Sequence, residues 1–173
     1  MTKHTPGMTH WSDSILHLQP CGDALKWLRT QPDAETAWHE RLPTNGRRRI
    51  GLVTSGNASM KADADRSVPL ELLTPLFSGI DADFHLLDKE IRDTDRAVAS
   101  RFPNIRCHEH EIVYIADVAA LASRMDRVVT VCTMAAHLAG ALGLPAWVML
   151  HDKPYMIWHD HASTSPWYPS LRL

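Results

Sequence analysis

Four residues in the first half of the chain have the types and spacing of a site that binds an anion. They are Gly56, Asn57, Lys61 and Arg66, and they follow a short apolar run that ends at Val53. A glycine at the end of a strand lets backbone amides approach a phosphate, and basic side chains neutralise its charge. The alternative is a solvated loop, in which Lys61 is simply exposed and Arg66 pairs with an aspartate just before it.

A second candidate anion site begins at Thr133, directly after the β-branched run 127–131. Residues 134–142 are small and rich in alanine, which predicts a helix that stops at Gly143. The free amides and dipole of a helix N-terminus attract an anion, and Thr133 can cap the helix and donate to a phosphate. His137, one turn further on, can contact a phosphate or ribose, or can be an ordinary helix histidine.

Histidine and cysteine are the other residue types that could carry chemistry. The chain has 11 His and 3 Cys, and no two of Cys21, Cys107 and Cys132 have CxxC spacing. This pattern argues against a disulfide framework or a zinc knuckle, and HxH pairs occur by chance in a His-rich chain, so we expect no metal. Cys132 has the position of an activated thiol at a helix start, but a small buried residue is the simpler interpretation.

Apolar runs and amphipathic segments alternate along most of the chain. We expect strands at 50–53, 83–87, 127–131 and 145–150, with a weaker one at 105–110. Helices are expected at 69–77 (capped by Ser67), 90–102, 112–125 and 134–142. This order predicts an α/β fold, a Rossmann-like parallel sheet with helices on both faces. Ligands of such sheets bind at the carboxyl ends of the strands, where segments 54–67 and 132–137 begin.

Composition limits the organisation and partners of the chain. We expect residues 1–20 to form a flexible lead-in and residues 21–46 to form linker helices, in two short pieces around Pro32. The Rossmann-like domain is expected at residues 47–173. The net charge of −2 argues against nucleic-acid or membrane-surface binding. The first residues lack the apolar segment of a signal peptide, and no apolar run is long enough to span a membrane. We therefore expect a cytoplasmic protein, with its oligomeric state open.

Several stretches carry a family resemblance when they are taken jointly. They are residues 50–57 with Lys61, Asp63, Arg66 and Ser67, then residues 130–143, 145–148 and 165–173. Together they resemble the C-terminal domain of heptosyltransferase-type glycosyltransferases (family nine), in the version attached to tetratricopeptide repeats in bacterial proteins. The C-terminal lobe of O-GlcNAc transferase is more distantly similar. The resemblance covers roughly residues 20–173.

The resemblance implies one half of a GT-B fold, the half that binds the nucleotide diphosphate of an activated sugar. The residues that would hold the diphosphate are Gly56, Asn57, Lys61 and Arg66 from one loop, and Thr133 and His137 from the other. Neither a metal nor another cofactor is implied, because basic groups and helix amides serve instead. Sugar transfer would need an acceptor half before residue 20, so we expect this chain alone to be inactive, with its catalytic residues unassigned.

The chain departs from the family pattern at several positions. Cys132 stands where the family usually has an aspartate, and Thr54 where an aromatic residue is common. Tyr155 and Ile157 lie in a stretch where the family has an Asp-Trp-Arg-Trp-like run, of which only the last residue, Trp158, is kept. Loss of these charges would weaken donor recognition. The alternative is therefore a diverged, non-catalytic module that binds a nucleotide or a protein partner.

Overall fold

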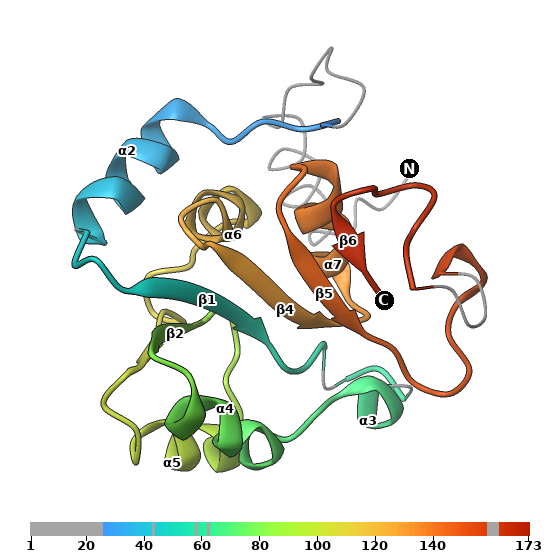
Figure 1. Ribbon diagram of the computed structural model, residues 1–173, viewed down its shortest axis with the longest axis horizontal. Coiled ribbons are helices and arrows are strands. Elements are labelled where there is room, and N and C mark those ends of the chain that lie inside the picture. The colour runs from blue at the N-terminus through green and yellow to red at the C-terminus, as the bar shows by residue number, and fades with distance from the viewer. Residues whose placement is uncertain (1–25, 43, 58, 62, 159–162) are drawn as a thin grey trace, which may run out of the picture.

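Six parallel strands form one sheet in the computed structural model, which describes residues 26–173 except 43, 58, 62 and 159–162. The strands are β1 (Arg48–Val53), β2 (Ala82–Leu86), β3 (Ile105–Cys107), β4 (Arg127–Val131), β5 (Ala146–Met149) and β6 (Leu171–Arg172). Their order is β3-β2-β1-β4-β5-β6 (Figure 1). This order reverses direction between β1 and β4, as in doubly wound Rossmann-like sheets, and confirms the predicted α/β fold class.

Helices cover both faces of the sheet. The 3₁₀ turn η1 (Leu70–Leu73) and helices α4 (Thr74–Gly79) and α5 (Asp93–Ala99) pack on one face, below the sheet in Figure 1. Helices α2 (Pro32–Arg41), α6 (Ile115–Ala122) and α7 (Met134–Ala141) pack on the other face. The short helix α3 (Asp63–Arg66) follows β1, and the 3₁₀ turn η2 (Met156–Trp158) follows β5.

Each face of the sheet has its own hydrophobic core. Leu52 belongs to the core under α4 and α5, whereas the next residue, Val53, belongs to the core under α6 and α7. This alternation follows from the strand geometry, in which successive side chains point to opposite faces. Trp38 of α2 is fully buried in the second core, so this helix is packed onto the sheet. No helix in the described part of the chain is long and apolar enough to cross a membrane.

The observed elements match the predicted ones closely, with some differences. Strands β1, β2, β4 and β5 lie within two residues of their expected bounds, and the weak candidate at 105–110 is strand β3. The predicted helix 69–77 is instead η1 followed by α4. Gly143 has φ +67°, the left-handed conformation expected of a helix stop. The lead-in 1–20 and the first linker residues lie outside the described residues.

One expectation about helix starts is wrong. Ser67 does not cap a helix, because its hydroxyl donates to Asp63 Oδ2 at 3.1 Å, and η1 begins after Pro69. Of the two helical pieces expected around Pro32, the described residues contain α2, which begins at Pro32 itself, whereas residues 26–31 are not helical. A proline is favourable in the first turn, since its missing N–H would have no partner there.

Candidate functional site

The carboxyl ends of β1 and β4 are adjacent, at the point where the strand order reverses. Two segments leave the sheet there: the β1 loop, residues 54–67, and the β4 loop, residues 132–137. One side chain connects them, because Arg66 Nη1 in the β1 loop donates to the carbonyl oxygen of Cys132 at 3.3 Å. Open α/β sheets bind ligands at such a crossing point. The structure therefore brings the two predicted loops together.

Three consecutive backbone amides at the start of the β1 loop donate to carboxylates. The N–H groups of Thr54 and Ser55 each lie 3.3 Å from an oxygen of Asp88, and Gly56 N–H lies 2.9 Å from Asp63 Oδ1. We expected the Gly56 amide to be open to a phosphate, and instead it is occupied by a side chain of the same loop. Two carboxylates thus fix the backbone at the start of this loop by accepting its hydrogen bonds.

The glycine at position 56 is required by packing. A Cβ atom there would lie 2.4 Å from Arg66 Nη2 and 2.5 Å from Asp63 Oδ1, too close for either contact to persist. The residue therefore lets the ion pair of Asp63 and Arg66 sit directly against the backbone. This is a different reason for a glycine from the close approach of a ligand.

Asp88 is a buried carboxyl group at the same edge that the sequence did not single out. It follows β2 by two residues, and its Oδ1 also lies 3.5 Å from the Ser55 hydroxyl. Burial raises the pKa of Asp88 to about 7, although hydrogen bonds from Thr54 and Ser55 act in the opposite direction. Its position just past a strand end is the signal that could have marked it, because the carboxyl ends of parallel strands share one edge.

Arg66 forms its ion pair with Asp63, one of the two aspartates just before it in the sequence. Arg66 Nε lies 3.2 Å from Asp63 Oδ1, and the guanidinium of Arg92 lies 2.7 Å from Asp63 Oδ2. Two positive charges therefore converge on one carboxylate, and the cluster keeps a net positive charge. The Asp63 side chain is only 3% exposed, whereas those of Arg66 and Arg92 are 21% and 35% exposed. Arg92 was not among the predicted residues.

Asn57 and Lys61 lie on the solvent side of the β1 loop. Asn57 Oδ1 accepts a hydrogen bond from Ser59 N–H at 2.9 Å, and its carbonyl accepts one from Met60 N–H at 3.0 Å. These bonds hold Ser59 and Met60 close to Asn57, in the way that short polar side chains commonly bond to the backbone of nearby residues. Lys61 is the next residue and is exposed. Its charge is therefore available at the surface of the loop.

The β4 loop places its two predicted residues in different surroundings. Thr133 is the first residue before α7, but its side chain makes no capping bond, and its buried Oγ1 has no partner among the described residues. The His137 ring stacks on Trp158 with 5.0 Å between ring centroids, and its Nδ1 lies 3.3 Å from the Tyr168 hydroxyl. Burial lowers the pKa of His137, which favours its neutral form.

Cys132 is hydrogen-bonded to the side chain of Trp158. The Nε1–H of Trp158, which is fully buried, points at Cys132 Sγ at 2.9 Å. Cys132 also packs against the core under α7. This supports the interpretation of Cys132 as a small packing residue. Tyr155, one of the expected departures from the family pattern, is 67% exposed.

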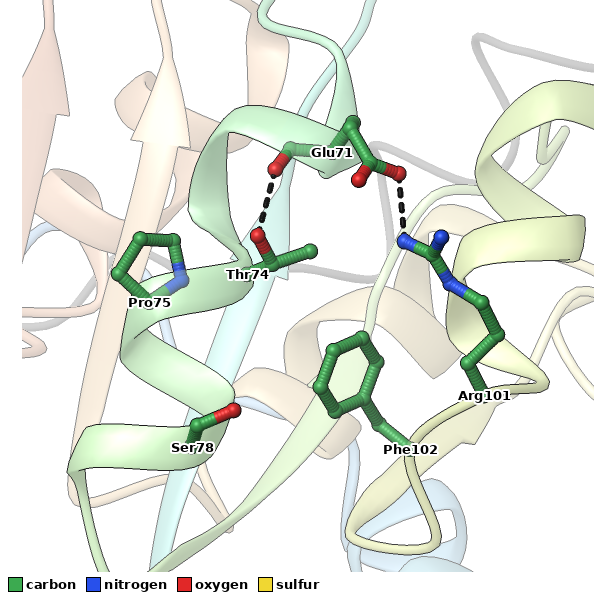
Figure 2. Close-up of a pocket in the computed structure, with 6 residues that line it drawn as sticks. All are labelled: Glu71, Thr74, Pro75, Ser78, Arg101 and Phe102. Carbon is green, nitrogen blue, oxygen red and sulfur yellow. Dashed lines mark hydrogen bonds and ion pairs between the residues drawn. The ribbon is translucent and has the colours of Figure 1, made fainter.

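The histidines do not gather into a metal site within the described ranges, where no group of three or more potential ligands occurs. His108, from one of the HxH pairs, instead bonds to His85 and Glu111 in the interior. A hollow elsewhere, between α4 and the end of α5, is lined by Glu71, Thr74, Pro75, Ser78, Arg101 and Phe102 (Figure 2). Its charges are already paired, because Arg101 binds Glu71 at 2.5 Å, so we assign it no ligand.

Comparison with known proteins gives structural similarity only. No protein-family model matches the chain. No curated protein matches it either. The solved structures that it resembles include the glycosyltransferase SnogD from Streptomyces nogalater, with 25% identity, a TM-score of 0.43, and 63% of this chain aligned to 27% of that one. Another is Thermosulfurimonas dismutans KpsC, a β-Kdo 2,4 transferase, with 16% identity, a TM-score of 0.41, and 75% of this chain aligned to 48% of that one. The chain thus spans less than half the length of either protein.

Proposed function

We propose that this domain binds the diphosphate of a nucleotide sugar at the junction of the β1 and β4 loops, as the donor-binding half of a glycosyltransferase-like protein. The observation that carries the proposal is the bridge from Arg66 to the Cys132 carbonyl, which sets a cationic cluster at the switch point of the sheet. The family resemblance of both loops supports the same assignment. Their positive charge suits a ligand with two phosphates.

The chemistry that such a site would supply is electrostatic. When a sugar–phosphate bond breaks by direct displacement, negative charge develops on the leaving diphosphate. The exposed charge of Lys61 and the outer edge of Arg66 would stabilise that charge, and the start of α7 at Thr133 would add its amides. His137 would take part by packing rather than by charge, because burial keeps it neutral. The proposal assigns no catalytic base, and transfer would need an acceptor-binding lobe.

A panel of ADP, UDP, GDP, CDP and their sugars, followed by thermal unfolding, tests the proposal. A ligand present at about 100 times its Kd stabilises a fold by about 2.7 kcal/mol, which raises the Tm of a domain of this size by roughly 5–10 °C. We expect one base to give this shift and Lys61→Ala to weaken binding about tenfold or more, because a charge-assisted contact is lost.

Lys26→Ala is the matched control for this experiment. Lys26 is exposed and precedes Trp27, whose backbone bonds to Ala141 at the end of α7 far from its start. This variant should bind like the unmodified protein. A well-folded protein that responds to none of these nucleotides would contradict the donor-site assignment. That result would favour the alternative function, a diverged module that binds a protein partner, which the substitutions at Cys132, Tyr155 and Ile157 support.

A further inference from the structure

We propose that Asp63 is an internal anion that positions Arg66 and Arg92, so that the cationic cluster is already assembled before any ligand binds. The inference rests on the proposed function only for the ligand that the cluster would bind. Asp63 does not face the surface, since its side chain is 3% exposed, and it does not itself contact a ligand. It is therefore a positioning residue, whose effect on binding would pass through the arginines.

The first support is the complete use of the Asp63 carboxylate. Oδ1 accepts from Gly56 N–H at 2.9 Å and from Arg66 Nε at 3.2 Å. Oδ2 accepts from the Arg92 guanidinium at 2.7 Å and from the Ser67 hydroxyl at 3.1 Å. Two bonds to each oxygen leave little freedom for rotation of the group. Such a carboxylate defines the positions of all four donors at once.

The second support is the contact of Arg66 with the β4 loop, which extends the fixed geometry of Asp63 to that loop. Arg66 uses Nε for Asp63 and Nη1 for the Cys132 carbonyl, so its planar guanidinium is fixed at two points. Its Nη2 lies 3.8 Å from Met60 Sδ on the exposed side of the loop. An arginine held in this way loses little conformational entropy when it binds an anion, because its geometry is already fixed. A lysine in the same place would not be oriented.

The third support is the charge state of Asp63. Burial raises its pKa, but hydrogen bonds from Arg66 and Ser67, together with the charge of Arg66, outweigh burial and bring the pKa below its usual value. The group is therefore ionised at neutral pH, as an internal anion must be. Loss of this charge would leave two arginines partly buried with no counterion, and breaking a buried pair in this way is strongly destabilising.

Replacement of Asp63 by alanine tests whether its role is that of an anion. The change removes the carboxylate and leaves a space bordered by two guanidinium groups and the Gly56 amide. We expect Asp63→Ala to have a lowered Tm in sodium chloride and to regain most of the loss in sodium sulfate of equal ionic strength. Sulfate stabilises most proteins somewhat, so the measured quantity is its effect on the variant minus its effect on the unmodified protein.

Asp65→Ala is the matched control, because Asp65 is an exposed carboxylate in the same short helix. It should show the sulfate effect of the unmodified protein and no more. An equal sulfate effect in all three proteins would overturn the proposal, since a purely steric role of Asp63 would not be rescued by an anion. If Asp63→Ala does not fold in chloride, recovery of its near-ultraviolet circular dichroism in sulfate alone is the supporting result, and failure in both salts overturns the proposal.

This test is independent of the nucleotide experiment. Sulfate rescue without any nucleotide response would keep Asp63 as an internal anion and remove the donor-site assignment. A nucleotide response without sulfate rescue would keep the donor site and remove the role of Asp63.

A second comparison uses Asp63→Asn, Arg66→Gln and the double variant. We expect the double variant to lose much less Tm than the sum of the single losses, because each single change already leaves a partner unpaired. Additive losses would contradict the proposal.

Discussion

At the scale of single residues, the candidate site depends on a close approach that only a glycine permits. Gly56 touches the Asp63–Arg66 pair through its backbone, and an added Cβ would lie 2.4 Å from Arg66 Nη2. We therefore expect Gly56→Ala to destabilise the protein by about 1–3 kcal/mol, the usual cost of overpacking, with a corresponding fall in the denaturant midpoint. Urea unfolding measures the loss directly.

Gly79→Ala is the control for that substitution. Gly79 is the last residue of α4, and a Cβ at this position meets no atom within 4 Å. Alanine there should be neutral or should stabilise the protein by up to about 1 kcal/mol, because it reduces the freedom of the unfolded chain. Equal midpoints for the two variants would show that the guanidinium and carboxylate move aside easily, and that the close packing at Gly56 is not a constraint.

Sequence reasoning found Lys61 and Arg66 of the site, but it assigned no role to Arg92 or to the carboxylate of Asp88. Arg66 was predicted with two possible partners, and only the folded chain decides between them, because Asp63 and Asp65 are both near it in sequence. Asp88 and Arg92 follow β2 in the chain, so they contact the β1 loop only because β1 and β2 are neighbours in the sheet. A buried carboxylate that binds backbone amides has no spacing motif of its own, so its position just past the end of β2 was the one sequence signal for Asp88.

At the scale of elements, strand β2 and the segment that follows β3 bring three titratable side chains into a row, of which two are buried histidines and the third is a glutamate that is 43% exposed. His85 Nδ1 lies 2.9 Å from His108 Nε2, and His108 Nδ1 lies 2.6 Å from Glu111 Oε2. An ionised Glu111 accepts the proton of His108 Nδ1, so His108 Nε2 must accept from His85 Nδ1–H. The tautomers of both rings are therefore determined. A proton added to His108 Nε2 would set donor against donor, and one added to His85 would go to Nε2, a buried atom with no partner among the described residues.

The buried ring of His85 predicts a loss of stability in mild acid, which is measured as the difference between the unmodified protein and a variant that lacks this ring. Burial lowers the pKa of His85 to about 4, the nearby His108, Arg106 and Arg49 act in the same direction, and Asp83 opposes them. The folded pKa is below the unfolded value, so the unfolded state binds more protons below about pH 6.5. The contribution of His85 to stability is complete above that pH and is lost progressively down to about pH 4, by up to roughly 3 kcal/mol, whereas the raised pKa of Asp88 changes stability in the opposite direction over the same range.

Thermal unfolding between pH 7.5 and 4 measures this effect against two variants. His85→Asn keeps a side-chain N–H near the position of Nδ1 but does not titrate, so its Tm should fall less steeply below pH 6.5. His39→Asn changes an exposed histidine of α2 and should leave the pH dependence unchanged. If His85→Asn follows the same curve as the unmodified protein, the acid sensitivity arises elsewhere and the buried histidines do not cause it.

The elements that sequence analysis predicted well are those with a strong local signal. Residues 127–131 and 134–142 were located almost to the residue because β-branched content, small residues and Gly143 mark them locally. Strand β6 was missed because it has only two residues, and its place depends on pairing with β5, Ala146 opposite Leu171. The start of η1 also depends on a distant residue, since Leu70 N–H donates to Asp95 of α5.

At the scale of the whole molecule, one sheet joins two separate cores. The core under α4 and α5 contains Phe77, whose ring lies 4.9 Å from that of Phe84. The core on the opposite face contains the fully buried Trp38 and Trp158. Because β1 and β4 contribute side chains to both cores, neither core can be lost without exposing the strands that support the other. The described domain should therefore unfold as one cooperative unit.

Phe77→Ala tests this coupling, because it changes one core while tryptophan fluorescence reports on the other. The substitution should cost about 3–5 kcal/mol, as expected for a buried phenylalanine, and lower the Tm by on the order of 10 °C. We expect far-ultraviolet circular dichroism and tryptophan fluorescence to show the same fall. Leu72→Ala, at a neighbouring residue that is 69% exposed, should change either midpoint little. A fluorescence midpoint that stays in place while the dichroism midpoint falls would mean that the two faces unfold separately. The switch point between β1 and β4 would then lie at a boundary between two units rather than inside one.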